Sequence, residues 1–315
     1  MQEGVVVKST GSWYAVHIKG EVVLCRIGGK FRLGKLKLTN PVAVGDQVMV
    51  EMENNEEGTG VIRKILNRDN YVLRQSPRRK HYMHLMAANI DQAALMVTLR
   101  DPAIKPGFID RYLLMTEPHN IPVLIVFNKI DIYTDEDFQK LSEFEEIYQR
   151  IGYDTLRVSA RTGIHIDELR GKLEGQRTLV SGQSGVGKSS LLNTLDPNLQ
   201  ILEGKLSEYS GKGQHTTTFA EMYTLSDQTE IIDTPGIKTL SFNNLEVQDV
   251  AHNFREFFEY SKECRFGDCT HRNEPGCAVK DAVRAGAISE VRYLNYIAIL
   301  SEIEDQNYWE RHTDL

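Results

Sequence analysis

Apolar and polar residues alternate through residues 4–66 of the chain, and turn residues interrupt the alternation every eight to twelve positions. A side-chain period of two is typical of half-buried β-strands. The pattern predicts five short strands, at residues 4–9, 12–18, 21–27, 45–52 and 60–66. Five short strands in a segment of this length favour a small closed barrel, and an OB-fold is the most economical choice. An SH3-like barrel produces the same alternation and stays open as the alternative.

Residues 89–245 follow a different pattern, in which short apolar runs alternate with amphipathic segments. Near-continuous apolar runs are typical of strands buried in a parallel sheet, and their alternation with helices predicts a doubly wound α/β domain. A charged segment at residues 68–84 that contains Pro77 is expected to be a loop joining this domain to the barrel. We expect strands at 91–99, 122–127, 154–160 and 176–182, and helices at 108–120, 135–152, 165–173 and 188–196.

From Glu246 the chain becomes helical, passes through a cysteine cluster and ends in a predicted helix at about residues 288–308. The sequence therefore predicts a multidomain protein with three parts. These are an OB-fold barrel that binds RNA (1–68), an α/β P-loop domain (69–245) and an α-helical metal-binding module (246–315).

Composition is that of an ordinary folded protein, with 315 residues, 41% of them hydrophobic and 26% charged. The longest apolar runs are strand-sized, far below the eighteen or so residues of a membrane span. The first ten residues lack a basic and then apolar leader. We expect a monomer in the cytoplasm with no membrane association.

The net charge is −7, so nucleic acid must be bound through local basic patches rather than through the overall field. Two runs are basic, at residues 26–37 and 74–84. Tyr14, Phe31 and Tyr82 are close to them in sequence and are candidates for stacking on unpaired bases, although burial is the expected fate of Tyr14. Each run alone is equally consistent with a solvated face.

The segment "GQSGVGKS" at residues 182–189 matches the phosphate-loop pattern G-x-x-x-x-G-K-S, with a strand before it and a helix after it. Glycines allow backbone N–H groups to surround phosphate oxygens, and the helix N-terminus adds its positive dipole end. The lysine of the pattern contacts the β- and γ-phosphates, and the serine hydroxyl binds Mg²⁺. The candidate phosphate-binding residues are Gly182, Gln183, Ser184, Gly185, Val186, Gly187, Lys188, Ser189 and Ser190.

A second motif, "EIIDTPG" at residues 230–236, is an apolar strand followed by a Pro-Gly turn. Asp233 is placed to hold Mg²⁺ through a water, and the Gly236 amide can approach the γ-phosphate. Between the two motifs lies "GKGQHTTT", and a mobile threonine here is expected to close on the metal. Thr216, Thr217 and Thr218 are candidates, and we favour Thr217 as the third magnesium-binding residue beside Ser189 and Asp233.

Two further motifs indicate guanine recognition. "NKID" at residues 128–131 follows an apolar strand, and an aspartate there accepts hydrogen bonds from the guanine N1–H and 2-amino groups, which adenine cannot supply. "VSARTG" at residues 158–163 follows the next strand. The predicted base-binding residues are Asn128, Lys129, Asp131, Ser159 and Ala160.

The base motifs precede the phosphate loop in this chain. All four motifs follow sheet strands, so a circular permutation leaves the binding edge of the sheet intact. The order therefore indicates a circularly permuted GTPase. It also brings the "DTPG" turn close to the C-terminal module, and we hypothesise that γ-phosphate sensing at Gly236 reaches that module.

The residue after "DTPG" is Ile237, an apolar side chain that cannot orient an attacking water. The catalytic group must come from elsewhere in the chain or from a bound effector. His215, beside the threonines, is the best local candidate, and the competing interpretation is an exposed loop histidine.

Residues 264–277 contain three cysteines and a histidine in the spacing C-x4-C-x-H-x5-C. Three thiolates and one imidazole form a closed tetrahedral set typical of one structural Zn²⁺ ion per chain. The predicted ligands are Cys264, Cys269, His271 and Cys277.

Together the permuted motifs, the "GKGQHTTT" loop and the cysteine cluster resemble the ribosome small subunit-dependent GTPase A family, over almost the whole chain. The resemblance implies a GTPase that binds the 30S subunit and its 16S rRNA through the barrel and the zinc module and assists late subunit maturation. It implies slow hydrolysis of GTP to GDP that the subunit stimulates, with His215 as the proposed catalytic residue. Two alternatives remain: an RNA-binding nucleotide switch with incidental hydrolysis, and a metabolic P-loop kinase, against which the guanine motifs argue.

Overall fold

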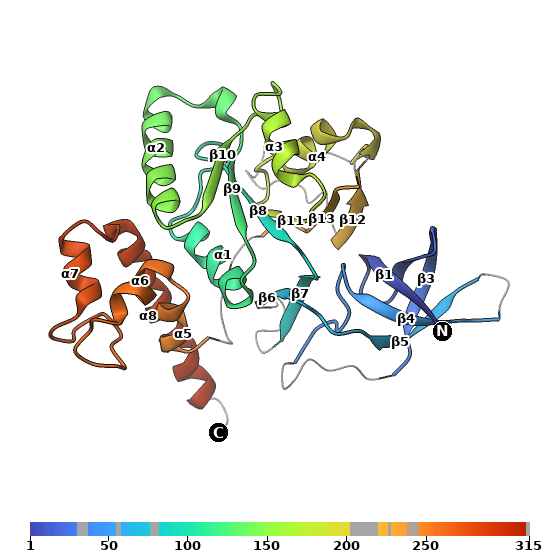
Figure 1. Ribbon diagram of the computed structural model, residues 1–315, viewed down its shortest axis with the longest axis horizontal. Helices are drawn as coiled ribbons and strands as arrows, with labels where there is room; N and C mark the ends of the chain where they lie inside the picture. Colours follow the sequence, from blue (N-terminus) through green and yellow to red (C-terminus); the bar gives the residue numbers. More distant parts are fainter. Residues whose placement is uncertain are drawn as a thin grey trace.

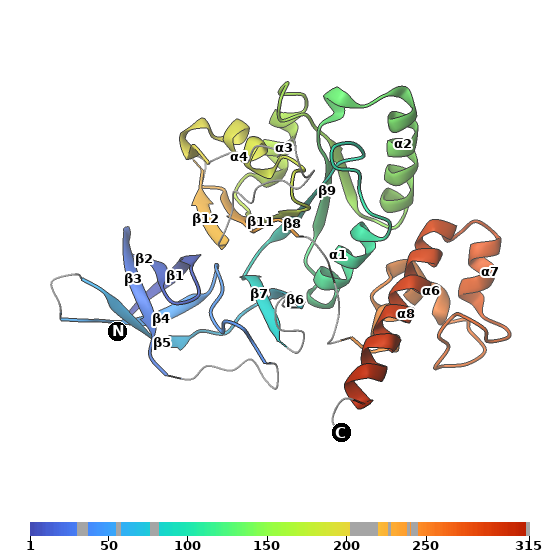
Figure 2. The same cartoon turned by 180° about the vertical axis from the view of Figure 1, so that it is seen from behind.

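The computed structural model of the chain describes residues 1–29, 37–54, 58–75, 82–201, 220–225, 228–237, 240 and 245–312. Three parts lie side by side in Figure 1: a barrel at one end, an α/β domain in the middle and a helical module at the other end. Figure 2 shows the same order from behind. This arrangement agrees with the multidomain fold predicted from the motifs.

The N-terminal barrel contains five strands that pair in the order β1-β2-β3-β5-β4 and close through β1 and β4. Alternate side chains point inward, as in β2, where Tyr14, Val16 and Ile18 are buried and His17 is exposed. The β3–β5 pairing is parallel and the others are antiparallel, so β5 must cross back to β3 over the intervening strand, which makes the barrel OB-like. The strands are β1 (Gln2–Ser9), β2 (Tyr14–Ile18), β3 (Glu21–Ile27), β4 (Gln47–Met52) and β5 (Gly60–Ile65).

The segment expected to be a loop at residues 68–84 contains strand instead. An antiparallel pair, β6 (Tyr71–Gln75) and β7 (Met83–Ala88), lies between the barrel and the α/β domain. The reason is that β7 is largely apolar and packs against the core, so its partner strand gains pairing despite its charges. The prediction was misled by the charge of the connection and by Pro77, which lies outside the described residues.

The central domain is built on a parallel sheet in the order β10-β9-β8-β11-β13. Helices α1 and α2 pack on one face and helices α3 and α4 on the other, as a doubly wound domain requires. The strands are β8 (Gln92–Val97), β9 (Val123–Phe127), β10 (Asp154–Arg157), β11 (Arg177–Gly182) and β13 (Glu230–Asp233). The helices are α1 (Phe108–Thr116), α2 (Asp135–Arg150), α3 (Ile166–Leu173) and α4 (Lys188–Leu195).

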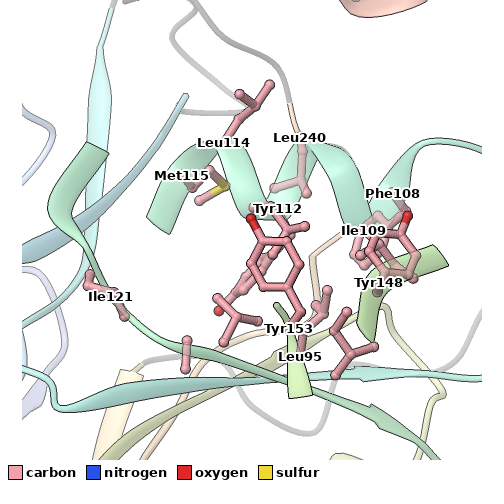
Figure 3. Close-up of a cluster of buried hydrophobic side chains, with 14 of the residues drawn as sticks. Leu95, Phe108, Ile109, Tyr112, Leu114, Met115, Ile121, Tyr148, Tyr153 and Leu240 are labelled. Carbon is pink, nitrogen blue, oxygen red and sulfur yellow. The ribbon is translucent and has the colours of Figure 1, made fainter. Parts of the chain in front are cut away.

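Helix α1 contributes most of the apolar layer on its face of the sheet. Tyr112 and Ile109 point from the helix toward Leu95 of β8, and Tyr148 of α2 lies beside them (Figure 3). All four side chains are nearly inaccessible to solvent. Their burial removes large apolar surfaces from water, which is the main contribution to the stability of this layer.

One more strand, β12 (Ala220–Thr224), pairs antiparallel with β13 and was not predicted. Its other edge pairs with β1 of the barrel, where Lys8 is opposite Glu221 and their side chains form an ion pair at 2.9 Å. The barrel and the α/β domain therefore share one continuous eleven-stranded sheet. This pairing joins residues more than two hundred positions apart, which local sequence patterns do not reveal.

The C-terminal module is helical, as predicted, and packs against α1 of the central domain. Arg292 is buried in this contact, and its guanidinium binds Asp110 of α1 at 2.6 Å and Glu256 of the module at 2.5 Å. Within the described part of the chain, no helix has the length and apolarity that a membrane span requires. The helices are α5 (Val247–His252), α6 (Arg255–Ser261), α7 (Ala278–Arg284) and α8 (Glu290–His312).

Candidate nucleotide site and metal centre

The predicted phosphate loop connects the end of β11 to the first turn of α4. Gly187 precedes the helix with a φ of 93°, and a Cβ at this position would lie 2.6 Å from Nδ2 of Asn128. Only glycine therefore permits both the turn and the close approach of the base motif. The loop presents its backbone N–H groups at the positive end of the α4 dipole, which is the arrangement that binds phosphate.

Lys188 of this loop is nearly buried, and its ammonium group lies 3.3 Å from the carbonyl oxygen of Gly182 and 3.5 Å from that of Gln183. Burial lowers the pKa of Lys188, while the negative charge of Asp233 opposes this shift. The side chain is thus held inside the loop, next to the carboxylate at the end of β13. A cation in this place is suited to neutralising phosphate oxygens.

Asp233 is the last residue of β13 and is fully buried, opposite Val180 in the parallel pairing of β11 and β13. Ser189 lies in the first turn of α4 and is also nearly buried. A buried carboxylate and a serine hydroxyl are oxygen ligands of the kind that Mg²⁺ prefers. Asp233 thus ends β13, and Ser189 lies in the first turn of the helix that follows the neighbouring strand β11. Both predicted magnesium-binding residues that the structure describes therefore follow adjacent strands at the carboxyl edge of the sheet.

Gly236 lies directly against the phosphate loop. A Cβ on Gly236 would lie 3.0 Å from the Cα of Ser184 and 3.1 Å from its backbone nitrogen. The next residue, Ile237, is fully buried, and its N–H donates to the carbonyl of Gly182 at 2.9 Å. The turn after β13 is thus packed and hydrogen-bonded onto the loop, and the buried Ile237 offers no polar group to a water.

The base motif follows β9 and meets the phosphate loop. The Asn128 side chain donates to the carbonyl of Val186 at 2.8 Å and accepts from the N–H of Ala160 at 3.1 Å. The ammonium of Lys129 donates to the carbonyl of Gly185 at 2.8 Å. The Asn128 amide therefore connects the base motif to the phosphate loop and to the loop after β10.

The loop after β10 is joined to the base motif by a second contact, because Ser159 Oγ donates to Oδ1 of Asp131 at 2.6 Å. This bond orients the carboxylate expected to recognise guanine. The structure brings Asn128, Lys129, Asp131, Ser159 and Ala160 together with the phosphate loop, as the motif order predicts.

Two side chains support these loops and were not singled out from the sequence. Tyr133 donates its hydroxyl hydrogen to the carbonyl of Asn128 at 3.0 Å and accepts from the N–H of Leu99 at 2.8 Å. Thr194 of α4 donates to the carbonyl of Ala160 at 3.0 Å. Tyr133 follows the base motif by only two residues, whereas no local signal identifies Thr194.

Two further predicted site residues are His215, assigned to the attacking water, and Thr217, whose hydroxyl is assigned to Mg²⁺ in catalysis. Both lie in residues 202–219, outside the part of the chain that the structure describes. Their roles stay predictions from the sequence.

The predicted metal ligands Cys264, Cys269, His271 and Cys277 converge in the C-terminal module, with all four ligand atoms within 4.8 Å of one another. Nδ1 of His271 lies 3.7 Å from Sγ of Cys264 and 3.5 Å from Sγ of Cys277. Ordinary Zn–S and Zn–N bond lengths in a tetrahedron place such atoms about 3.6 Å apart. The four residues therefore fit a tetrahedral metal ion.

The surroundings of this cluster fix its geometry. Tyr293 and Tyr296 of α8 donate to the carbonyls of His271 and Thr270 at 2.8 and 2.9 Å. Burial, together with the neighbouring Cys277, raises the pKa of the Cys269 thiol to about 12. A bound cation is what holds such a thiol as a thiolate near neutral pH.

The two basic runs lie largely outside the described residues, which omit 30–36 and 76–81 together with Phe31. Of the remaining residues, Arg26 is exposed and forms an ion pair with Glu53. Arg74 is half-buried, and this partial loss of water lowers the pKa of its guanidinium. Tyr82 is half-buried, and Tyr14 is buried with its hydroxyl bonded to Asn40. Tyr14 is therefore part of the barrel core and cannot stack on a base.

Comparison with known proteins places the chain beside ribosome-associated GTPases. The family model described as RsgA GTPase matches residues 65–243, and that described as RsgA N-terminal domain matches residues 3–61. The small ribosomal subunit biogenesis GTPase RsgA 2 of Bacteroides thetaiotaomicron is 44% identical over 307 residues, which cover 97% of this chain and 98% of the relative. RsgA of Bacteroides fragilis is 45% identical over 307 residues, with the same coverage.

Two solved structures have the same fold over nearly the whole chain. YjeQ from Thermotoga maritima has a TM-score of 0.74 and 36% identity, with coverage of 96% of this chain and 98% of that structure. YloQ, described as a circularly permuted GTPase, has a TM-score of 0.70 and 30% identity, with coverage of 97% and 96%. The permuted order inferred from the motifs is thus confirmed by the fold.

Proposed function

The chain belongs to the RsgA family of GTPases, and on this basis we propose that it hydrolyses GTP to GDP and phosphate while bound to the small ribosomal subunit during its maturation. The observation that carries the proposal is the hydrogen bond from the Asn128 amide to the Val186 carbonyl. It connects a guanine motif to a phosphate loop although the two are in reversed order along the chain. A chance match of either motif would not bring the two loops into contact.

In this proposal the base is recognised by the loops after β9 and β10. Asp131, oriented by Ser159, accepts the guanine N1–H and 2-amino hydrogens. The Ala160 N–H, which donates to Oδ1 of Asn128 in this structure, would donate to O6 when guanine is bound. Asn128 holds the loops and the Lys129 stem covers the ring. Because adenine has an acceptor where guanine has N1–H, the same carboxylate rejects ATP.

The phosphates bind residues 182–190, with Lys188 at the β- and γ-phosphates. Ser189, Asp233 and Thr217 would hold Mg²⁺, which supplies positive charge to the phosphate oxygens. The Gly236 N–H donates a hydrogen bond to the γ-phosphate when GTP is bound.

The attacking water is oriented by His215 in this proposal, because the chain has the buried Ile237 where many GTPases have a glutamine. The competing arrangement is that the ribosomal subunit supplies the orienting group. The two arrangements differ in whether removal of His215 lowers turnover on the subunit.

We assign one structural Zn²⁺ ion to the Cys264, Cys269, His271 and Cys277 cluster. When bound, the ion supplies the positive charge that keeps the three sulfurs deprotonated. The set leaves no open position, so its role is to fold the module.

For RNA, charge favours the barrel as the main contact. Residues 1–68 contain ten Lys and Arg against seven Asp and Glu, whereas residues 246–315 contain eight against fourteen. Because phosphate neutralisation supplies most of the affinity for RNA, the barrel is the better electrostatic partner for 16S rRNA. We divide the protein at residues 68 and 245 and expect it to act in the cytoplasm as a monomer.

Two experiments test this function. ATP should fail to displace a fluorescent GDP analogue at concentrations where GTP displaces it fully, and equal competition by ATP would favour a metabolic kinase. The protein should sediment with 30S subunits in the presence of a non-hydrolysable GTP analogue, and less so as salt rises. Binding without stimulated hydrolysis would favour an RNA-binding switch.

A further inference from the structure

A row of three charged side chains connects the barrel to the end of β13. Glu221, the second residue of β12, is paired directly with Asp233, the last residue of β13. Lys8, near the end of barrel strand β1, is paired directly with Glu221. Directly paired residues of antiparallel strands project their side chains from the same face of a sheet. Lys8, Glu221 and Asp233 therefore lie side by side on one face of the continuous sheet.

The Glu221 carboxylate is held in this row by two side chains. Its Oε2 accepts a hydrogen bond from the ammonium of Lys8 at 2.9 Å and one from the hydroxyl of Tyr223 at 3.3 Å. The side chains of Lys8 and Glu221 are 42% and 32% exposed, whereas Asp233 is fully buried. An ion pair in such contact with water is weak, so Lys8 offsets the charge of Glu221 only in part.

The two carboxylates act on the same part of this face. Like charges on directly paired strands repel each other, and here each carboxylate has a cation close by. Lys8 bonds Glu221, and Asp233 opposes the lowering of the Lys188 pKa that burial causes. Burial and the charges of Glu221 and Asp233 raise the pKa of Tyr223. The fields of the two carboxylates therefore overlap beside the residue proposed to hold Mg²⁺.

We propose that Glu221 is a positioning residue of the magnesium site and that Lys8 of the barrel sets how strongly its charge acts there. The inference rests on the proposed function, in which Asp233 holds Mg²⁺. Mg²⁺ keeps several of its waters in proteins, and a carboxylate beside a metal-holding carboxylate accepts from such waters and adds negative charge. Because Lys8 neutralises part of that charge, the barrel contributes to metal binding at the nucleotide site.

The test is the magnesium midpoint, the Mg²⁺ concentration at which the full-length protein shows half-maximal binding of a fluorescent GDP analogue. Glu221→Gln keeps the size of the side chain and removes its charge. We expect it to raise the midpoint about tenfold, the lower end of the loss caused by removing a group behind a metal ligand. Affinity for the analogue in excess EDTA should change by less than about twofold, which is below the usual coupling between sites.

Lys8→Met should shift the magnesium midpoint in the opposite direction. Without its cation, Glu221 adds more negative charge to the site, so we expect the midpoint to fall about two- to fivefold, the range that an exposed ion pair supports. Lys8→Arg keeps the cation and should keep the wild-type midpoint. The double variant Lys8→Met/Glu221→Gln should match Glu221→Gln alone, because Lys8 acts through Glu221.

The matched control is another exposed ion pair of the barrel, between Arg63 of β5 and Glu51 of β4. Arg63→Met and Glu51→Gln make the same changes of charge in a different part of the barrel and should leave the magnesium midpoint unchanged. Shifts in these controls as large as those of Lys8→Met and Glu221→Gln would mean that the midpoint follows the overall charge of the protein, and the inference would be wrong.

An unchanged magnesium midpoint in Glu221→Gln, or an equal loss of affinity for the analogue with and without metal, would overturn the inference and leave the GTPase assignment intact. A shift caused by Lys8→Met that persists in the double variant would overturn it as well. Failure of the wild-type protein to bind the GDP analogue would instead contradict the proposed function, and the inference would fall with it.

Discussion

The side-chain amide of Asn128 donates a hydrogen bond to the backbone carbonyl of Val186, fifty-eight residues further along the chain. The two residues belong to the base motif and the phosphate loop, and the base motif comes first. In a parallel sheet the carboxyl ends of all strands share one edge, so the contact survives any reordering that keeps the strands in place. The permutation thus changes the order of the chain and preserves the site.

Replacement of Asp131 by Asn should change the preferred base. The amide would donate where the carboxylate accepts, which suits the 2-oxo group of xanthine and opposes the 2-amino group of guanine. Because hydrogen bonds to charged groups contribute about 1.5–3 kcal/mol each, we expect GTP affinity to fall by about 100-fold or more. Competition between GTP and XTP for the site measures this. Asp135→Asn, at the exposed start of α2, is the control, and unchanged guanine selectivity in Asp131→Asn would remove Asp131 from the site.

Replacement of His215 by Ala should preserve affinity for a GTP analogue and reduce turnover, because the imidazole is assigned to the water and not to the nucleotide. A positioned acid or base contributes about 10²- to 10⁴-fold, so a loss of at least about tenfold is expected on the ribosomal subunit. Single-turnover hydrolysis is the measurement, with His17→Ala on the exposed face of β2 as control. If His215→Ala hydrolyses GTP at the wild-type rate on the subunit, the ribosomal subunit and not His215 orients the attacking water.

Elemental analysis of the purified protein should give one zinc ion per chain. Cys269→Ser removes one of four ligands and should lower the zinc content and loosen the C-terminal module, visible as faster amide exchange in α7 and α8. Cys25→Ser changes a buried cysteine in the barrel and should leave zinc content at one. Zinc retained by Cys269→Ser, or absent from the wild type, contradicts the assignment.

Replacement of Arg292 by Met should destabilise the protein strongly. Arg292 is 2% exposed and bonds the buried carboxylates of Asp110 and Glu256, which the substitution leaves without their cation. Removal of one partner from a buried ion pair costs about 3–5 kcal/mol. Urea denaturation measures this, with Arg284→Met as an exposed control that should cost under about 1 kcal/mol. If Arg292→Met lowers the free energy of unfolding by no more than the control does, the carboxylates of Asp110 and Glu256 are solvated and the prediction is wrong.

The sequence predicted the elements whose apolar residues recur with a clear period and the sites whose residues stand at a fixed spacing along the chain. The five barrel strands, the strand–loop–helix of the phosphate loop and the convergence of the Cys264 cluster are all local patterns. Their chemistry needs particular residue types at fixed distances along the chain, so the pattern suffices.

Features that depend on contacts between distant segments were missed. The β1–β12 pairing and the Asp110–Arg292–Glu256 cluster join distant parts of the chain. No pattern within either part indicates that the two parts are in contact. Strand β6 and the first two residues of β7 were taken for a loop because the segment is charged, and the apolar run from Leu85 to Ala88 that follows it was assigned to no element. Glu221 looked like one of many charged positions between the two phosphate motifs, and only the fold shows that it is paired with Lys8 and Asp233.

The central claim is that this chain hydrolyses GTP in response to the small ribosomal subunit, and single-turnover hydrolysis tests it most directly. The rate constant should be measured with labelled GTP and excess protein, alone, with purified 30S subunits, and with 50S subunits as control. We predict a rate constant that rises with 30S concentration and saturates, and that 50S subunits leave unchanged. Equal rate constants with and without 30S subunits would contradict the account.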